Sequence, residues 1–150
     1  MPRSDSAGPP APQAFRPGLM QLDPPRLLGS RCTACGTAGF PARPFCPHCR
    51  ATDGITGVVL SPQGRVHSFT VVRQAPPGVE VPYVLAYVDL DDGVRVMAQV
   101  AAPGPGPSDG RGVEIGTPVR LELAPVATAG QEEELMGYRF TTCAATEVPA

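Results

Sequence analysis

Apolar and polar side chains alternate along most of the chain after residue 57. In VRVMAQV, residues 94–100, valine or alanine occupies every second position, and Arg95, Met97 and Gln99 lie between them. Successive side chains of a β-strand point to opposite faces of a sheet, so this period of two predicts a strand with one buried face. The same kind of pattern predicts further strands in residues 64–74, 82–93, 116–126 and 135–143.

Two details refine this pattern. In the first of these strands the period places Val66, Ser68 and Thr70 on one face and His67 on the other. The second strand ends in Asp-Asp-Gly at 91–93, directly before the strand that follows, and such a tripeptide between two apolar runs is typical of a hairpin turn. We therefore expect the second and third strands to pair with each other.

The remaining stretches of this region are expected to connect the strands. AAPGPGPSDGRG (101–112) predicts a surface loop, and GQEEE (130–134) predicts a polar turn. Five short strands with loops between them indicate a mainly β fold. A closed five-stranded barrel of the oligonucleotide/oligosaccharide-binding (OB) type fits the pattern, and an SH3-like barrel fits it too, because periodicity alone does not choose between them.

The composition changes the picture at the N-terminus. The chain contains 20 prolines and 17 glycines, which disfavours long helices. Residues 1–25 are Pro-rich with little periodicity, so we expect a flexible arm that orders on a partner. PPRLLGSR (24–31) fits either a short helical turn or a strand. We divide the rest into a cysteine module (26–56), a barrel (57–143) and a frayed tail (144–150).

Four of the five cysteines lie within residues 31–50 as two Cys-x-x-Cys pairs with ten residues between the pairs. Two residues between paired cysteines let both sulfurs of one tight turn reach the same ion, and zinc prefers four tetrahedral ligands. A redox dithiol is the alternative, but neither pair stands at a strand-to-helix junction of a βαβ unit. We predict one zinc ion per chain, bound by Cys32, Cys35, Cys46 and Cys49.

The predicted zinc site is structural rather than catalytic, because four thiolates leave no open position for water. Gly36 relieves the backbone after the first pair, whereas Arg50 stands at the matching position after the second, so we expect a slightly different second turn. His48 lies inside that second turn and is expected to point outward. Cys143, in the last strand, is expected to be a small buried apolar residue.

Charge and targeting signals narrow the class of protein. The net charge is −2, with twelve arginines and no lysine, which argues against nonspecific nucleic-acid binding. The N-terminus lacks the apolar segment of a secretory signal, and no stretch approaches the roughly 18 apolar residues of a membrane span. We therefore expect a cytoplasmic protein, in which thiols stay reduced and favour a metal over a disulfide.

Four segments carry a resemblance to a known family: RLLGSRCTACGTAGFPARPFCPHC, GRVHSFTVV, PYVLAYVDLDDGVRVMAQV and IGTPVRLEL. In this order, from about Leu27 to Phe140, they resemble the DUF35 family of zinc-ribbon OB-fold proteins associated with acyl-CoA enzymes. The resemblance implies a rubredoxin-like ribbon that binds zinc, an OB-fold barrel, and often a helical segment before the ribbon. The Pro-rich arm departs from this last feature.

The resemblance also implies a function. Members of the family usually accompany a thiolase-like enzyme, a 3-hydroxy-3-methylglutaryl-CoA synthase, a steroid side-chain aldolase or a MaoC-like hydratase. They act as non-catalytic subunits that bridge active sites or help to bind the acyl-CoA. We therefore expect an accessory subunit of an acyl-CoA or polyketide-type enzyme, a ketosynthase included, with a cleft between ribbon and barrel for the CoA arm.

Two sets of residues are candidates for the contacts of such a subunit. Guanidinium groups match phosphate bidentately, although each single arginine also fits a solvated surface charge. The candidate phosphate contacts are Arg43, Arg65, Arg73 and Arg95. Apolar side chains that prove exposed would contact the partner enzyme. The candidates for that role are Phe40, Phe45 and Leu60.

Two other functions compete with this one. Ribbons and OB-folds also bind single-stranded nucleic acid, for which Phe69, Tyr83 and Tyr87 are the stacking candidates, but the chain has no basic stripe to accompany them. An independent enzyme is disfavoured because no Ser-His-Asp set and no phosphate loop is present. The acidic group in the hairpin fits a solvated turn, and His67 fits a surface or interface residue. That acidic group comprises Asp89, Asp91 and Asp92.

Overall fold

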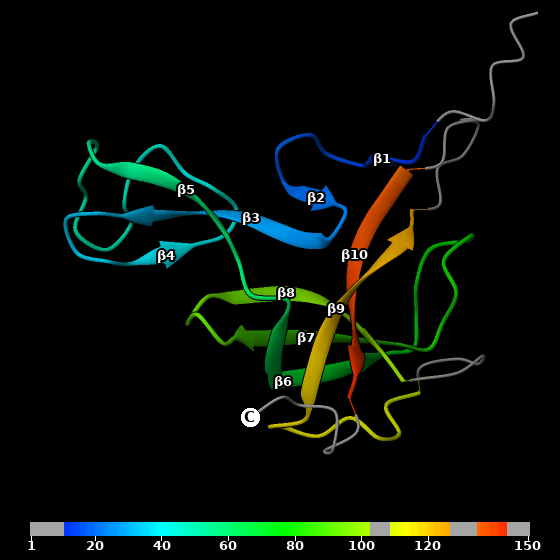
Figure 1. Ribbon diagram of the computed structural model, residues 1–150. Coiled ribbons are helices and arrows are strands. Elements are labelled where there is room, and N and C mark those ends of the chain that lie inside the picture. The colour runs from blue at the N-terminus through cyan, green and yellow to red at the C-terminus, as the bar shows by residue number, and fades with distance from the viewer. Residues whose placement is uncertain (1–10, 103–108, 127–134, 144–150) are drawn as a thin grey trace, which may run out of the picture.

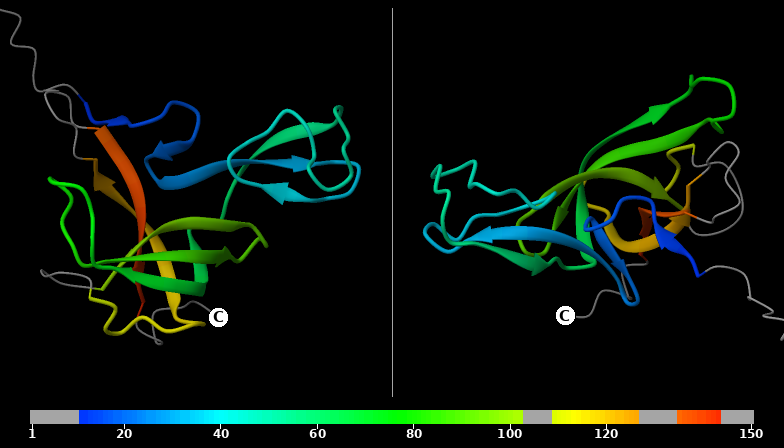
Figure 2. Two further views of the ribbon diagram at one scale, coloured as in Figure 1. Left: turned by 180° about the vertical axis from the view of Figure 1, so that it is seen from behind. Right: turned by 90° about the horizontal axis from the view of Figure 1, so that it is seen from above.

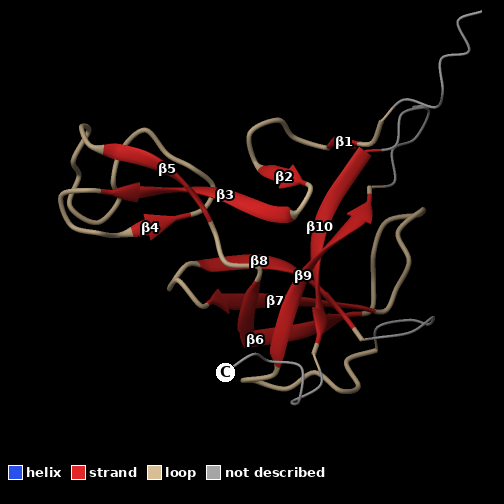
Figure 3. Cartoon of the chain, in the orientation of Figure 1, coloured by secondary structure: helices blue, strands red, loops and turns tan. Residues whose placement is uncertain are grey.

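Figure 1 shows the computed structural model of the chain, which describes residues 11–102, 109–126 and 135–143. These residues form strands, turns and loops without a helix, as Figure 3 shows, so the mainly β class is confirmed. Within this part of the chain no helix is long and apolar enough to cross a membrane. The polar turn expected at 130–134 and the tail at 144–150 lie outside the described residues. The strands are β1 Gln13–Ala14, β2 Met20–Leu22, β3 Pro25–Cys32, β4 Ala38–Gly39, β5 Ile55–Val59, β6 Gln63–Val72, β7 Tyr83–Leu90, β8 Arg95–Ala101, β9 Pro118–Pro125 and β10 Leu135–Thr142.

Strands β6 to β10 close into a barrel. The larger sheet has the order β1-β10-β8-β7-β6-β9, and β9 also pairs with β10, which completes the circuit. Within the barrel β8 and β10 run parallel and meet at two residue pairs, one of which is Val100 opposite Phe140. The other barrel pairs are antiparallel, including the hairpin expected between β7 and β8. The closed five-stranded sheet is therefore confirmed.

The alternation that predicted the strands also forms the core. In β8, Arg95, Met97 and Gln99 are exposed, whereas the residues between them are buried. Phe140 of β10 is completely buried and belongs to the same cluster. Removal of apolar surface from water is the main term that stabilises such a core, at about 1.5–3 kcal/mol for each fully buried large apolar side chain.

Strand β6 departs from regular alternation at His67. Val66 pairs with the buried Val88, but Ser68 pairs with the exposed Tyr87, so the register shifts between these two positions. Paired residues of neighbouring strands lie on the same face of a sheet. The prediction that Val66 and Ser68 share a face is therefore wrong, because the bulge inserts one residue and reverses the alternation after it.

The segment before the ribbon corrects the expectation of an arm over residues 1–25. Its described part, 11–25, forms two short strands: β1 pairs with β10 of the barrel, and β2 pairs with β3. Leu19 and Met20 are buried. Two apolar residues among prolines and polar residues carry no period, so the sequence pattern pointed to disorder although both side chains pack inside the fold. Residues 1–10 lie outside the described part.

The ribbon sheet is built around β3. Strands β4 and β5 both pair antiparallel with Ser30 and Arg31 of β3, so they flank it on opposite edges. Residues 25–31 of the stretch 24–31 thus lie in a strand, which settles the two alternatives left by its sequence. The three views of Figures 1 and 2 show the ribbon extending to one side of the barrel, with β5 leading directly into β6.

Ribbon and barrel share one hydrophobic core. Leu27 of β3 and Leu60, which follows β5, are almost completely buried and belong to the same cluster as Phe140. The ring of Phe40 also packs edge-on against Tyr138 of β10, with ring centroids 5.9 Å apart. Leu60 was a candidate exposed contact for a partner, and its burial corrects that expectation. The shared core holds the ribbon in place against the barrel.

Candidate metal centre and the cleft beside it

Two tight turns bring the four paired cysteines together. Cys32 ends β3 and Cys35 follows it in the first turn, while Cys46 and Cys49 flank the second turn, before β5. The four Sγ atoms all lie within 4.8 Å of one another. The Cys32–Cys49 and Cys35–Cys46 sulfur distances are both 3.6 Å. Within this cluster Cys32 and Cys46 are buried, and Cys35 and Cys49 are exposed.

The two turns have the same backbone conformation. Gly36 N–H donates to the Cys32 carbonyl at 2.8 Å, and Arg50 N–H donates to the Cys46 carbonyl at 2.9 Å. Gly36 has a φ of 78° and Arg50 a φ of 65°, both in the left-handed region. The expectation of a different second turn is therefore corrected: Arg50 adopts the conformation that glycine provides in the first turn, at a cost in strain.

The electrostatics of the cluster favour a cation. The Thr37 hydroxyl, 3.2 Å from the Cys35 sulfur, helps to lower the pKa of Cys35 to about 6. A backbone hydrogen bond from Ala51 lowers the pKa of Cys49, but the neighbouring thiols, Cys32 foremost, raise it to about 11. Four thiolates this close together repel one another unless a positive ion lies between them.

The sulfur spacing also fits a metal. Zn–S bonds of about 2.3 Å in a tetrahedron place the sulfurs roughly 3.8 Å apart. The observed distances of 3.6 Å are close to that value. The four cysteines therefore form a metal-binding site with four thiol donors. His48 lies in the second turn and is exposed, as expected. Cys143 is only partly buried and lies outside the cluster, beside Arg120 of β9.

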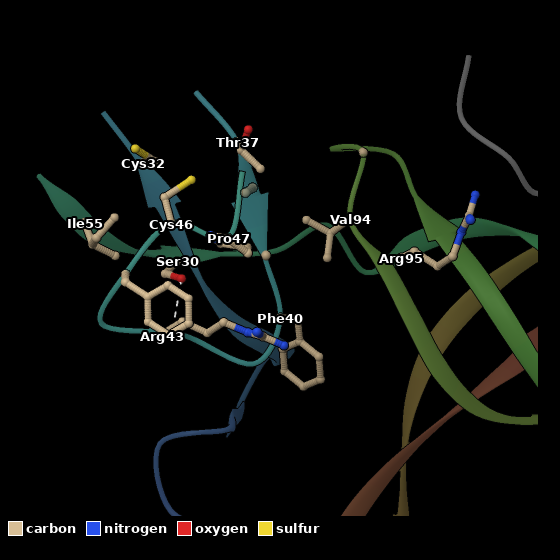
Figure 4. A pocket seen from close by; sticks show the side chains of 14 residues that line it. Ser30, Cys32, Thr37, Phe40, Arg43, Cys46, Pro47, Ile55, Val94 and Arg95 are labelled. Atoms are coloured by element: carbon tan, nitrogen blue, oxygen red, sulfur yellow. Dashed lines mark hydrogen bonds between the residues drawn. The ribbon is translucent and has the colours of Figure 1, made fainter. Parts of the chain in front are cut away.

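A cleft of about 240 Å³ lies between the ribbon and the β7–β8 turn. It contains side chains of both halves of the molecule, including two of the metal-site cysteines, Cys32 and Cys46. Arg43 belongs to the loop between the two cysteine pairs, and its backbone N–H donates to the hydroxyl of buried Ser30 at 3.1 Å. Figure 4 shows the Arg43 side chain extending past Ser30 toward Phe40. The expected cleft between ribbon and barrel is thus present, and the exposed Arg43 lines it.

Arg95 lines the same cleft, but its charge is engaged elsewhere. Its Nε and Nη2 donate to the two carboxylate oxygens of Asp89 at 2.6 and 3.1 Å, and Nη2 lies 3.1 Å from His67 Nδ1. The Arg95 hydrogen bond is the main cause that lowers the pKa of Asp89, and the same bond raises the pKa of Arg95. In Figure 4 the guanidinium points away from Arg43 and Cys46.

The other two predicted arginines lie away from the cleft. Arg65 donates to the Gly116 carbonyl at 3.1 Å and borders a small cavity next to Cys143. Arg73 immediately follows β6, outside the cleft. The predicted set of four is therefore not brought together: among the described residues that line the cleft, its arginines are Arg43 and Arg95.

The hairpin turn also differs in detail from its expected role. Asp91 is exposed, but Asp92 is partly buried and its carboxylate accepts a hydrogen bond from Ser61 N–H at 2.9 Å. Asp89 pairs with Arg95 and His67. These contacts tie Asp89 and Asp92 into the fold.

Sequence reasoning missed several residues of the cleft. Ser30 is a buried polar residue that fixes the Arg43 loop, yet a serine within LLGSRC carries no distinctive pattern. Phe40 and Phe45 were singled out as apolar contacts for a partner, and both line the cleft. Phe45 is 45% exposed, whereas Phe40 is partly buried against the core. No local pattern marked Phe40 and Phe45 as cleft residues, because the fold rather than a period in the sequence brings them there.

A second, apolar groove lies on the outer surface of the barrel, across β6, β7 and β8, with a volume of about 200 Å³. Phe69 and Tyr87, two of the three stacking candidates, line it. Tyr83 does not, and is half-buried at the start of β7. The residues that line this groove are Ser68, Phe69, Thr70, Leu85, Ala86, Tyr87 and Met97, all uncharged.

Comparison with known families defines the class of this architecture. Residues 21–53 match the family described as "ChsH2, rubredoxin-like zinc ribbon domain", and residues 57–124 match "ChsH2, C-terminal OB-fold domain". The molecule is thus a zinc-ribbon OB-fold protein, which excludes the SH3-like alternative for the barrel.

Similar proteins extend this result over most of the chain. A DUF35 domain-containing scaffold protein of Methanocaldococcus jannaschii is 34% identical over 117 residues, which is 76% of this chain and 79% of the relative. The benzoylsuccinyl-CoA thiolase subunit BbsA of Geobacter metallireducens is 30% identical over 135 residues, or 84% of each chain. The solved Ltp2-ChsH2(DUF35) aldolase matches with a TM-score of 0.59 and 36% identity, covering 78% of this chain and 84% of that one. The chain belongs to the DUF35 family.

Proposed function

We propose that this chain is a non-catalytic accessory subunit of an acyl-CoA-processing enzyme in the cytoplasm. The observation that carries the proposal is its similarity, along most of its length, to proteins named as a scaffold, a thiolase subunit and part of an aldolase. The site agrees with this role, because a closed set of four thiolates suits a structural metal rather than activation of water. A thiolase-like enzyme, ketosynthase, aldolase or hydratase is the expected partner.

We further propose that the metal is zinc, one ion per chain. The ligands would be Cys32, Cys35, Cys46 and Cys49, whose sulfur spacing suits a tetrahedral ion. In this role the ion would hold both turns of the ribbon and, through them, the loop that carries Arg43.

The cleft beside the metal is the proposed contact to acyl-CoA. Arg43 is the leading candidate to bind a CoA phosphate, because its backbone is fixed by Ser30 and its side chain lies in the cleft. Arg95 would bind phosphate only if its ion pair with Asp89 were broken. At about 240 Å³ the cleft is smaller than the roughly 300–1,000 Å³ of pockets that enclose a ligand of drug size. It would therefore bind part of the CoA while the partner enzyme covers the rest.

The competing function, binding of single-stranded nucleic acid, has less support. Tyr87 is exposed in the outer groove, as a stacking residue needs to be, whereas Phe69 pairs with the buried Ala86 and so lies on the opposite face of the sheet. However, single-strand sites combine such rings with cations that track the phosphate backbone, and the described residues lining this groove are uncharged. The groove is suited to apolar contacts instead.

Co-expression with candidate acyl-CoA enzymes of the same organism, namely thiolase-like enzymes, ketosynthases, aldolases and hydratases, tests the proposed function. We expect the two proteins to co-elute in size-exclusion chromatography, the turnover of the enzyme to change when this chain is present, and this chain alone to turn over no acyl-CoA. Absence of co-elution together with unchanged turnover would refute the proposal. A shift of generic single-stranded DNA in a gel would favour the competing function.

The role of Arg43 needs a separate measurement. In the complex, Arg43→Ala is expected to weaken acyl-CoA binding about 10-fold or more, because hydrogen bonds to charged groups contribute about 1.5–3 kcal/mol. Arg73→Ala removes an arginine outside the cleft and is the matched control, with unchanged affinity. Equal affinities of the two variants, measured by calorimetry, would remove Arg43 from the site.

A further inference from the structure

Strand β5 is paired along one edge within the described part of the chain. All five of its residues, Ile55–Val59, pair with β3, and no described strand pairs with its other edge. Figure 1 shows β5 on the outside of the ribbon, and the view from above in Figure 2 also places it at the margin of the sheet. A sheet edge of this kind offers backbone donors and acceptors to another extended chain.

The hydrogen-bond pattern identifies the groups on that outer edge. Leu60 N–H donates to the Leu27 carbonyl at 2.9 Å, so it points toward β3. Because N–H groups of a strand alternate between its two edges, those of Val58 and Thr56 also point toward β3. The N–H and C=O groups of Gly57 and Val59 therefore point away from it. They stand two residues apart, which is the spacing of an antiparallel or parallel ladder.

The outer edge of β5 lacks the usual protection against pairing. Natural edge strands are blocked by charged side chains, proline, bulges or very short length. β5 reads Ile-Thr-Gly-Val-Val, without charge or proline, and pairs with β3 in regular register. Val59 is 58% exposed, and Thr56 and Gly57 are exposed as well. By contrast, β4 on the opposite side of β3 is two residues long, a length that limits pairing.

The edge also indicates the chemistry of its occupant. A Cβ built at Gly57 would meet nothing within 4 Å, so there is room beside it for a large side chain on an incoming strand. β-Branched and aromatic residues make the favourable cross-strand pairs with a surface such as Val59. The matching segment is therefore extended, uncharged and rich in β-branched or aromatic residues.

A second copy of this chain is a poor occupant. Pairing of two β5 strands would involve five residues from each copy, whereas a stable interface uses about 20–30 residues from each side. A partner enzyme that already contacts this chain elsewhere faces no such limit, because its extended segment would bind at high effective concentration.

We propose that the outer edge of β5 binds an extended segment of the partner acyl-CoA enzyme as an added strand of the ribbon sheet. This inference rests on the proposed function, because it requires that partner. The backbone of Gly57 and Val59 supplies the hydrogen bonds, and the exposed Val59 side chain supplies the apolar contact. Main-chain pairing gives affinity in this mode of recognition, and the side chains beside it give specificity.

Hydrogen exchange on the unmodified chain tests the inference directly. In the free chain the amides of Gly57 and Val59 should exchange fast, while those of Thr56 and Val58 are protected by β3. In the purified complex with the acyl-CoA enzyme that co-elutes with this chain, exchange at Gly57 and Val59 should slow at least 10-fold. Unchanged exchange at these two amides in an intact complex would overturn the inference and leave the proposed function standing. Failure to form any complex would refute both.

A pair of variants at one position provides the second test. Gly57→Pro removes the outward N–H and leaves the bonds to β3, since proline is tolerated in edge strands where its nitrogen faces solvent. Gly57→Ala keeps the N–H and places its methyl group in open space. We expect Gly57→Pro to weaken the complex at least 10-fold, and Gly57→Ala, which keeps the donor, to weaken it less. Retained binding by a folded, metal-loaded Gly57→Pro would overturn the inference. So would self-association of the free chain that this variant abolishes, because the occupant would then be a second copy.

Discussion

At the scale of single residues, the metal centre depends on backbone conformation as much as on its thiols. Both turns need a left-handed residue directly after the second cysteine, because the N–H of that residue closes the turn onto the first cysteine. Gly36 adopts this conformation without steric cost. Arg50 adopts it with its Cβ close to the backbone, a strain of about 1–2 kcal/mol for a non-glycine residue. The fold thus holds Arg50 in a left-handed conformation that a non-glycine residue disfavours.

This strain makes Arg50→Gly a stabilising change. Glycine relieves the steric cost but adds about 0.5–1 kcal/mol of chain entropy in the unfolded state, so a net gain of up to about 1 kcal/mol is expected. The measurement is the guanidinium chloride midpoint of the metal-loaded chain. Gly36→Ala is the matched control, since its Cβ meets nothing within 4 Å and any loss comes from the backbone alone. It should lower stability by about 1 kcal/mol. A loss of stability in Arg50→Gly would show that the arginine side chain has a role that outweighs the strain.

At the scale of elements, close packing fixes how β3 lies against its neighbours. A Cβ at Gly29 of β3 would clash with the Gly39 carbonyl and crowd the side chain of Leu60. The backbones of β3 and of the strand after the first turn can approach this closely because position 29 carries no side chain.

Gly29→Ala is therefore expected to destabilise the chain by about 1–3 kcal/mol, as overpacking of a tight interior does. Gly57→Ala on the neighbouring strand β5 is the matched control, because Gly57 is exposed and a Cβ there meets nothing within 4 Å. This control should change the free energy of unfolding by less than about 0.5 kcal/mol. Thermal unfolding of the two variants compares the effects, and equal stability would contradict the close approach of β3 to its neighbour.

The sequence predicted those elements that show a hydrophobic period or a characteristic residue spacing. The alternation in 94–100 identified a strand and its buried face, and the cysteine spacing identified the metal cluster. It failed where structure depends on contacts far along the chain. The bulge at His67 is set by pairing with β7, and Leu19 is buried only because β1 and β2 dock on other strands. Which of the four predicted arginines line the cleft likewise followed only from the fold.

At the scale of the whole molecule, ribbon and barrel behave as one unit. Leu27 and Leu60 from the ribbon side lie in the same cluster as the barrel residues, and Phe40 packs against Tyr138. Loss of the metal would loosen the two turns of the ribbon, and this effect reaches the barrel through the shared core. A small module of this kind derives much of its folding free energy from its metal.

Metal removal should accordingly lower the melting temperature of the entire chain in one transition, rather than melt the ribbon alone. Cys35→Ser removes one exposed ligand and is expected to abolish stoichiometric zinc and lower the melting temperature. Cys143→Ser changes the cysteine outside the cluster and should keep one zinc per chain. Elemental analysis and calorimetry provide the readouts. Two separate transitions after chelation, or full zinc content in Cys35→Ser, would contradict this account.

The shared core also bears on how such a protein is divided and inherited. A barrel expressed from residue 57 onward would lack Met20 and Leu27, which belong to its interior, and would expose the apolar surface that they cover. Gene fusion or recombination that separated the ribbon from the barrel would therefore yield two aggregation-prone halves. We therefore expect the two parts to be inherited as a pair, and this chain matches both of the corresponding family domains in the order ribbon, then barrel.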